Sequence, residues 1–173
     1  MEISLVLVKK KEKEKEILKN LSEKYSYEIS QYLENDVNAL GLYNYWDDFD
    51  FDFDYYWSQK KWRPYFIKVD KKLAGFVLIT NEKRFSNNTK YFLQDFFVMY
   101  KYRRMGVGTY ILEIIFEKFK GKWELLCHHK NNPARIFWRK NIKRFSNNNF
   151  KIIKKTKLTY IDGSIPEGMI FEI

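Results

Sequence analysis

A basic, glycine-containing segment between a strand-like run and a helix-like run constrains this chain most. Residues 102–109 read YRRMGVGT; they follow an apolar run at residues 91–99 and open a helical run at residues 109–120. Glycines let backbone N–H groups approach an anion closely, and a helix start adds partial positive charge. The segment lacks the Lys-Ser/Thr pair of the P-loop and the third glycine of the dinucleotide fingerprint. It therefore predicts a phosphate-binding turn of another type.

Length and composition predict one domain over residues 1–173. The 15 Phe, 13 Tyr and 5 Trp, set against only 7 Gly and 3 Pro, argue for a packed core and against disorder. The single cysteine, Cys127, excludes an intrachain disulfide and fits a reducing compartment. The apolar run at residues 3–8 is too short for a signal or membrane segment. We therefore expect a cytoplasmic protein without membrane association, as a monomer or homodimer.

The formal net charge of +10 raises nucleic-acid binding as an alternative. Residues 122–157 hold eleven Lys or Arg and one acid, Glu124. These cations fall on several predicted elements rather than on one stripe. Lysine, asparagine, isoleucine and the aromatics are also enriched together along the chain, which indicates a general compositional bias. Nucleic acid is therefore the less favoured partner.

Apolar periodicity predicts a mixed α/β (α+β) fold built on one sheet. Ile17, Leu18, Leu21 and Tyr25 share a helix face, although Ser26 and Ser30 leave two shorter helices as an alternative. Residues 35–61 form a long loop or a short helix. Strands are predicted at residues 2–8, 64–69, 73–80, 91–99, 123–127, 149–158 and 168–173, and helices at residues 10–33, 109–120 and 133–140.

A second motif follows one helix and one strand after the glycine turn. Residues 131–140 read NNPARIFWRK, which resembles the N-x-x-A-x-x-F-(Y/W) segment of the GNAT acetyltransferase superfamily. The Arg103, Gly106 and Gly108 spacing resembles the acyl-CoA pyrophosphate loop of the same superfamily, and the order of elements agrees along nearly the whole chain. The segments at residues 55–57, 74–76 and 137–140 look like those of a bacterial branch of predicted acetyltransferases.

This resemblance implies a mostly antiparallel sheet of about seven strands flanked by helices, with the fourth and fifth strands splayed apart. It also implies acetyl-CoA as cosubstrate, with its pantetheine arm between those strands and its pyrophosphate on the amides of the turn. The cofactor-binding residues so implied are Phe97, Val98, Arg103, Arg104, Met105, Gly106, Val107, Gly108, Thr109, Asn131 and Phe137. For some of these residues a structural role is the alternative to cofactor contact: Arg103 and Arg104 would lie in a solvated turn, Asn131 would cap a helix, and Phe137 would pack in the core.

Acetyl transfer to an amine requires a base, and Asp95 is the catalytic candidate. A carboxylate among apolar strand residues is costly unless it meets water or a cation, and burial raises its pKa toward a useful value. The alternative is a wet strand face that touches no substrate. Trp138 occupies the position of the usual acidic tyrosine, so Tyr102, Tyr110 or solvent would protonate the leaving thiolate.

Residues 47–54 alternate Asp and Phe, and aromatic rings flank them. This pattern suits a cationic acceptor bound through Tyr43, Tyr45, Trp46 and Trp57, although a solvated loop anchored by its aromatic rings is the favoured interpretation. Adjacent His128 and His129 on a strand would point to opposite faces, so no metal site is expected. The leading hypothesis is an acetyl-CoA-dependent N-acetyltransferase that acts in a ternary complex on the primary amine of a small molecule or protein. A non-catalytic acyl-CoA-binding module is the alternative.

Overall fold

Seven strands form one sheet in the computed structural model, which describes residues 1–43, 62–154, 156–160 and 162–173. Three helices and one 3-10 turn accompany the sheet in this part of the chain. The strands are β1 (Ile3–Leu7), β2 (Trp62–Val69), β3 (Lys72–Thr80), β4 (Tyr91–Val98), β5 (Lys122–Cys127), β6 (Phe150–Ile153) and β7 (Glu167–Glu172). The helical elements are α1 (Glu12–Leu33), η1 (Tyr100–Tyr102), α3 (Val107–Lys118) and α4 (Asn132–Phe145).

The strand order is β1-β2-β3-β4-β5-β7-β6, and β4 with β5 is the one parallel pair in the described sheet. The helix α3 joins these two strands, as a parallel pair requires a crossover connection. The prediction of a mixed, mostly antiparallel seven-stranded sheet flanked by helices is confirmed. The strands β2 and β3 form a hairpin with a two-residue turn, in which Asp70 and Lys71 have φ of 47° and 64°.

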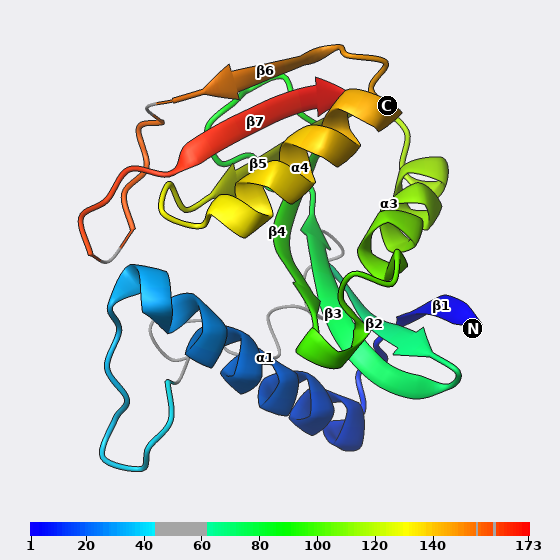
Figure 1. The fold of residues 1–173 in the computed structure, drawn as a ribbon, viewed down its shortest axis with the longest axis vertical. Coiled ribbons are helices and arrows are strands. Elements are labelled where there is room, and N and C mark those ends of the chain that lie inside the picture. Colours follow the sequence, from blue (N-terminus) through cyan, green and yellow to red (C-terminus); the bar gives the residue numbers. More distant parts are fainter. Residues whose placement is uncertain (44–61, 155, 161) are drawn as a thin grey trace.

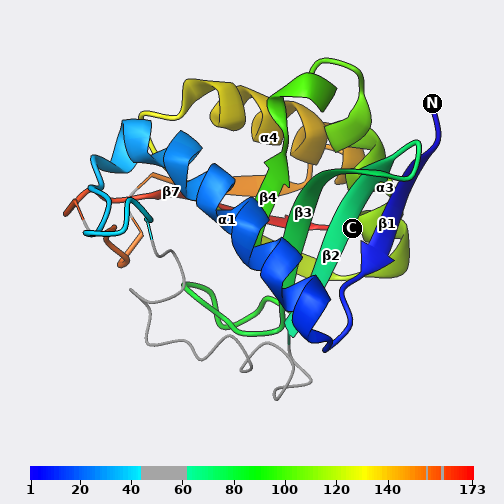
Figure 2. The same cartoon turned by 90° about the horizontal axis from the view of Figure 1, so that it is seen from below.

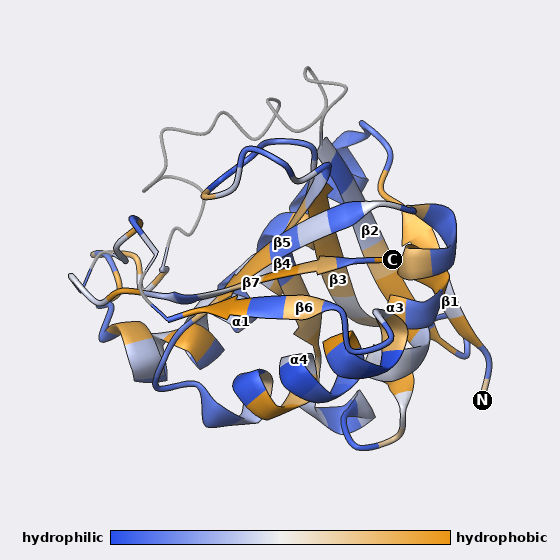
Figure 3. Ribbon diagram, turned by 90° about the horizontal axis from the view of Figure 1, so that it is seen from above, coloured by the Kyte–Doolittle hydropathy of each residue, from blue (hydrophilic) through white to orange (hydrophobic). Residues whose placement is uncertain are grey.

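The helices divide between the two faces of the sheet (Figures 1 and 2). Leu18 and Leu21 of α1 pack on one face, against Phe66, Phe76 and Phe97 among others. The helices α3 and α4 cover the other face, where the larger core gathers around a fully buried Trp123. Figure 3 shows the apolar residues concentrated on the strands and on the inner sides of the helices. The sheet thus separates an α1 side from an α3–α4 side.

The helix α1 runs unbroken over Glu12–Leu33, close to the predicted residues 10–33, so the alternative of two shorter helices is wrong. Within it, Ser22 Oγ donates to Leu18 O at 2.9 Å and Ser30 Oγ to Tyr27 O at 2.7 Å. Other boundaries differ from the sequence-based expectation. The helix α4 extends to Phe145, five residues beyond the predicted end. The strand β6 covers only Phe150–Ile153 of the ten residues predicted. None of the described helices is long and apolar enough to span a lipid bilayer.

The strands β3 and β4 approach each other closely at Gly75. A Cβ on this residue would lie 1.9 Å from Phe97 O, and its φ of 156° disfavours any side chain. Gly75 pairs with Val98, the last residue of β4. The glycine therefore fixes the end of β4 against β3, just before the chain enters the turn.

Candidate functional site

The strands β4 and β5 stay paired over only three residues, from Tyr91 opposite Trp123 to Leu93 opposite Leu125. Beyond Leu93, β4 continues along β3, while the two parallel strands diverge (Figure 1). Met99 N–H donates to Ala74 O at 2.8 Å. Because antiparallel strands alternate their hydrogen-bonding directions, the backbone groups of Val98 point to the open edge and those of Phe97 point to β3.

A β-bulge in β4 sets the direction of Asp95. Leu78 pairs with Asp95, but its neighbour Ile79 pairs with Leu93, so Gln94 is an extra residue in β4. Leu93 and the half-buried Phe96 both pack on the α3–α4 side. Leu93 and Phe96 are three residues apart and would face opposite sides in a regular strand; the extra residue places them on the same side. Asp95, next to Phe96, therefore faces the α1 side. The carboxylate thus lies just past the last paired residues of β4 and β5.

Asp95 is only 4% exposed and meets a tyrosine hydroxyl from α1. Burial, together with the charge of Asp95 and a hydrogen bond to it, raises the pKa of Tyr25 well above its usual value. Tyr160, from the connection between β6 and β7, also lies near; burial and then the charges of Cys127 and Asp95 raise its pKa. Both hydroxyls therefore stay protonated at neutral pH and can donate a hydrogen bond.

The glycine turn has the backbone conformation that an anion site needs. Arg104 has φ of 60° and Gly106 has φ of 80°, so the chain reverses sharply before α3 begins at Val107. The first N–H groups of a helix have no acceptor within the helix. Arg104, Met105 and Gly106 are exposed, and a Cβ on Gly106 would meet open space. The turn therefore presents amides and a cation to solvent.

Arg103 links this turn to β4 and α1. Its Nε donates to Val98 O at 2.6 Å, and its guanidinium lies 5.8 Å from the centre of the Phe97 ring. A guanidinium N–H also forms an ion pair with Glu28 of α1. Arg103 would have to share or leave these contacts to hold a phosphate, so the exposed Arg104 is the more accessible of the two arginines.

The start of α4 lies against the start of α3. Asn131 caps α4, because its Oδ1 accepts a hydrogen bond from Ala134 N at 3.1 Å. The half-buried Phe137 packs on Phe96 and so closely on α3 that a Cβ at Gly108 would lie 3.1 Å from its ring. Trp138 is buried beside Phe96. The second motif therefore borders the β4–β5 opening from the α3–α4 side.

A family model, the Acetyltransferase (GNAT) family, matches residues 27–142. This match covers more than half of the chain and includes the bulge, the glycine turn and the start of α4. The chain belongs to the GNAT acetyltransferase family. It is accordingly an acyltransferase by family, and the resemblance stated from the two sequence motifs is confirmed.

Solved structures share the GNAT fold over the full length of this chain. An acetyltransferase from Thermus thermophilus is 11% identical with a TM-score of 0.66, covering 100% of this chain and 98% of its own. The PaiA N-acetyltransferase from Thermoplasma acidophilum, in complex with coenzyme A, is 15% identical with a TM-score of 0.64 and full coverage of both chains. A GNAT acetyltransferase from Staphylococcus aureus Mu50 is 16% identical with a TM-score of 0.62, covering 99% of each chain. A comparison with curated protein sequences gives no significant match.

The acceptor-binding residues predicted for this GNAT chain fall mostly outside the described residues. Tyr45, Trp46 and Trp57 are among them, as is the Asp-Phe alternation. Tyr43 lies beside α1: its backbone N–H donates to Glu23 Oε2 at 2.9 Å, and its hydroxyl lies 3.2 Å from Ser30 Oγ. Its role in binding an acceptor stays a prediction.

The expectation that His128 and His129 point to opposite faces is wrong. Their rings stack 4.6 Å apart, because β5 ends at Cys127 and strand alternation no longer applies. Lys130 N donates to His128 Nδ1 at 3.2 Å, while His128 Nε2 faces both Ser164 Oγ at 2.9 Å and Asp162 Oδ2 at 3.5 Å. Serine and aspartate thus share one nitrogen, which is not the arrangement of a hydrolytic triad. The contacts fasten the β6–β7 connection to the end of β5.

Cys127 is a buried thiol rather than a reactive one. Burial, and next the charge of Glu167, raises its pKa to about 12, although Arg135 and Arg139 oppose the shift. A thiol with this pKa is almost fully protonated at neutral pH and is therefore a poor nucleophile. No group of three His, Cys, Asp or Glu side chains suited to a metal occurs among the described residues.

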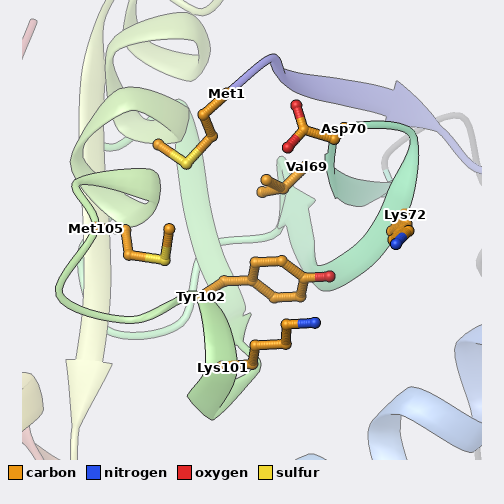
Figure 4. Close-up of a pocket in the computed structure, with 7 residues that line it drawn as sticks. All are labelled: Met1, Val69, Asp70, Lys72, Lys101, Tyr102 and Met105. Atoms are coloured by element: carbon orange, nitrogen blue, oxygen red, sulfur yellow. The ribbon is translucent and has the colours of Figure 1, made fainter.

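Met105 and Tyr102 line a small cavity of about 250 Å³ between the turn and the β2–β3 hairpin (Figure 4). Tyr102 is buried here, on the opposite side of the turn from the β4–β5 opening, and Tyr110 is exposed on α3. Tyr25 and Tyr160 are instead the hydroxyls that lie near Asp95. Tyr25 could have been found from its place on the apolar face of α1, whereas Tyr160 carries no sequence signal.

Proposed function

We propose that this GNAT enzyme transfers an acetyl group from acetyl-CoA directly to a primary amine in a ternary complex. The observation that carries the proposal is the bulge in β4, which places the buried Asp95 where β4 and β5 separate. The acceptor is the amine of a small molecule or of a protein.

Asp95 has the role of general base. The amine nitrogen forms the new bond to the acetyl carbon as the carbon–sulfur bond breaks, and the amine proton passes to the Asp95 carboxylate directly or through water. Tyr25 and Tyr160 replace Tyr102 and Tyr110 as the hydroxyls that would donate a hydrogen bond to the departing sulfur, because they lie near Asp95. Their raised pKa makes them poor proton donors, so the thiolate takes its proton from solvent.

The cofactor side would be formed by the turn and by the open edge of β4. The amides at the start of α3 and the exposed Arg104 suit a pyrophosphate. Val98 directs its N–H to the opening, while its carbonyl accepts from Arg103, and Phe137 borders the opening. The relative from Thermoplasma acidophilum is a complex with coenzyme A, which agrees with the same class of cosubstrate.

Acetyl-CoA is expected to raise the melting temperature of the protein by about 5–10 °C. A ligand at about 100 times its dissociation constant adds roughly 2.7 kcal/mol to the free energy of unfolding. For a domain of this size each kcal/mol corresponds to about 2–4 °C. Differential scanning fluorimetry with and without millimolar acetyl-CoA measures the shift, and CoA release with a panel of amines then tests transfer. A shift without transfer to any amine would favour the non-catalytic module.

Gly106→Ala is expected to reduce that thermal shift and to weaken acetyl-CoA binding by about tenfold. The added Cβ has room in the unliganded protein, but φ of 80° strains any L side chain by roughly 1–2 kcal/mol and the methyl group faces the phosphate surface. Gly163→Ala is the matched control, because Gly163 has φ of 77° with equally open surroundings away from the turn. Equal acetyl-CoA affinity in the parent and Gly106→Ala would contradict the placement of the phosphate.

A further inference from the structure

A cavity of about 420 Å³ lies at the opposite end of β4 from the glycine turn. Residues 83–87 of the β3–β4 connection line it on one side, and Ile153, Thr156 and Lys157 near β6 line it on the other. Its volume is within the range of roughly 300–1,000 Å³ typical of small-molecule sites. Its lining residue Arg84 contacts Phe92 and Gln94, which at about 3.3 Å per residue lie roughly 13–20 Å along β4 from Val98, where the turn follows. It is therefore separate from the phosphate surface.

The lining of this cavity suits an anion. Three cations, Lys83, Arg84 and Lys157, contribute to it, together with the polar side chains of Ser86, Asn87 and Thr156. None of the described lining residues is acidic. A carboxylate or a phosphate is the ligand group that such donors bind best.

Arg84 is held in a fixed orientation at the wall of the cavity. Its guanidinium lies 5.7 Å from the centre of the Phe92 ring and 5.9 Å from that of Trp62. Nη2 donates to Gln94 Oε1 at 3.3 Å and pairs with Glu82 Oε2 at 3.4 Å. Both contacts use Nη2, so within the described residues Nε and Nη1 can still donate to a ligand.

The buried carboxylate of Glu124 holds residues 83–87 of the β3–β4 connection in place. Glu124 of β5 is fully buried, and its Oε1 accepts a hydrogen bond from Arg84 N at 2.5 Å. Burial raises the pKa of Glu124, while backbone hydrogen bonds from Arg84, Phe85 and Ser86 oppose that shift. The loop amides are therefore directed to Glu124, and the side chains of the loop are left to line the cavity.

The bulge residue Gln94 lies between the cavity and Asp95, the catalytic candidate. Gln94, which contacts Arg84, is the extra residue next to Asp95. Phe92 pairs with Thr80 and Asp95 with Leu78, so Phe92 and Asp95 share the α1 side of the sheet. Arg84 and the Asp95 carboxylate therefore lie on the same face, on either side of Gln94.

We propose that this cavity binds an anionic group of the acceptor, so that the substrate is a primary amine that also carries a carboxylate or a phosphate. The inference rests on the proposed function, with the amine at Asp95 and the anion at Arg84. It narrows the acceptor class from any primary amine to a primary amine that also carries an anionic group. This differs from the cationic acceptor considered for residues 47–54.

Calorimetric titration of the 173-residue chain with matched amines tests binding without any need for turnover. The pairs are β-alanine against β-alaninamide and phosphoethanolamine against ethanolamine, with inorganic phosphate as a separate probe. We expect the anionic member of at least one pair to bind at least tenfold more tightly. Arg84→Gln should remove this preference, while the control Lys140→Gln, at an exposed position on α4, should keep it. Equal binding within both pairs, or inorganic phosphate as tight as phosphoethanolamine, would overturn the proposal.

Steady-state kinetics with the same pairs separate this inference from the proposed function. Arg84→Gln should raise KM for the preferred anionic amine by roughly 10- to 100-fold, the effect of losing charge-assisted hydrogen bonds, with kcat and the neutral amines little changed. Lys157→Gln, at an exposed position, gives a second variant in case Arg84→Gln fails to fold. Faster acetylation of the neutral amines would overturn the anion site and keep the acetyltransferase. Arg84-dependent binding of an anionic amine without acetylation of any amine would instead support the anion site and overturn the proposed acetyltransferase activity.

Discussion

Asp95→Asn is expected to lower turnover by about 10²–10⁴, the usual range for loss of an acid–base group. Acetyl-CoA affinity should stay at the parent value, because the proposed cofactor contacts come from the turn and the edge of β4. The amide has nearly the shape of the carboxylate and can still accept the hydrogen bond from Tyr25. Steady-state kinetics of CoA release, with acetyl-CoA binding measured in parallel, give both quantities.

The dependence on pH distinguishes a base from an electrostatic contact. If Asp95 removes the amine proton, the deficit of Asp95→Asn should shrink as pH rises, because more of the acceptor then arrives deprotonated. If Asp95 only attracts a cationic amine, the acceptor KM should rise while kcat stays near the parent value. Asp36→Asn removes an exposed carboxylate and is the control. An unchanged kcat/KM between about pH 6 and 9 would exclude both roles.

Gly75→Ala is expected to destabilise the protein by about 3 kcal/mol or more, a fall in melting temperature of about 6–12 °C. The new Cβ would lie 1.9 Å from the carbonyl oxygen of Phe97, which belongs to the backbone and cannot rotate away. The strands β3 and β4 must therefore separate at the end of β4. Thermal or chemical denaturation measures the loss.

Gly41→Ala provides the comparison for Gly75→Ala. Gly41 also has a positive φ, of 74°, but a Cβ there meets no atom within 4 Å. This variant should lose only the conformational term, roughly 1–2 kcal/mol. Equal destabilisation by the two substitutions would show that backbone conformation, and not the approach of β3 to β4, accounts for the effect at Gly75.

The periodicity of apolar residues was sufficient to predict the sheet and its helices, because each buried face repeats at the spacing of its element. The glycine turn was also recognisable, because a glycine between a strand pattern and a helix pattern indicates a sharp reversal of the chain. The structure shows this reversal in the positive φ values of Arg104 and Gly106. Boundaries were less predictable. The helix α4 continues past Lys140 because Ile142 packs into the core, a tertiary contact that local propensity does not contain.

The contacts of the site were mostly hidden from the sequence. Arg103 pairs with Glu28, which lies 75 residues earlier, and Tyr160 reaches the neighbourhood of Asp95 from the β6–β7 connection. His128 and His129 stack because the strand has ended, whereas the pattern suggested that it continued. Each of these depends on long-range packing that no local spacing encodes.

Because β4 contains one extra residue, Gln94, the side of the sheet that Asp95 faces depends on the number of residues before it in the strand. If Gln94 were paired in the ladder and the strand kept strict alternation, Asp95 would face the α3–α4 side together with Leu93, and Phe96 would turn to the α1 side. Leaving Gln94 unpaired in the bulge keeps the carboxylate on the α1 side and the apolar residues after it on their own sides. A sequence alignment that closes this one-residue insertion would therefore assign the base to a side chain buried beneath the helices.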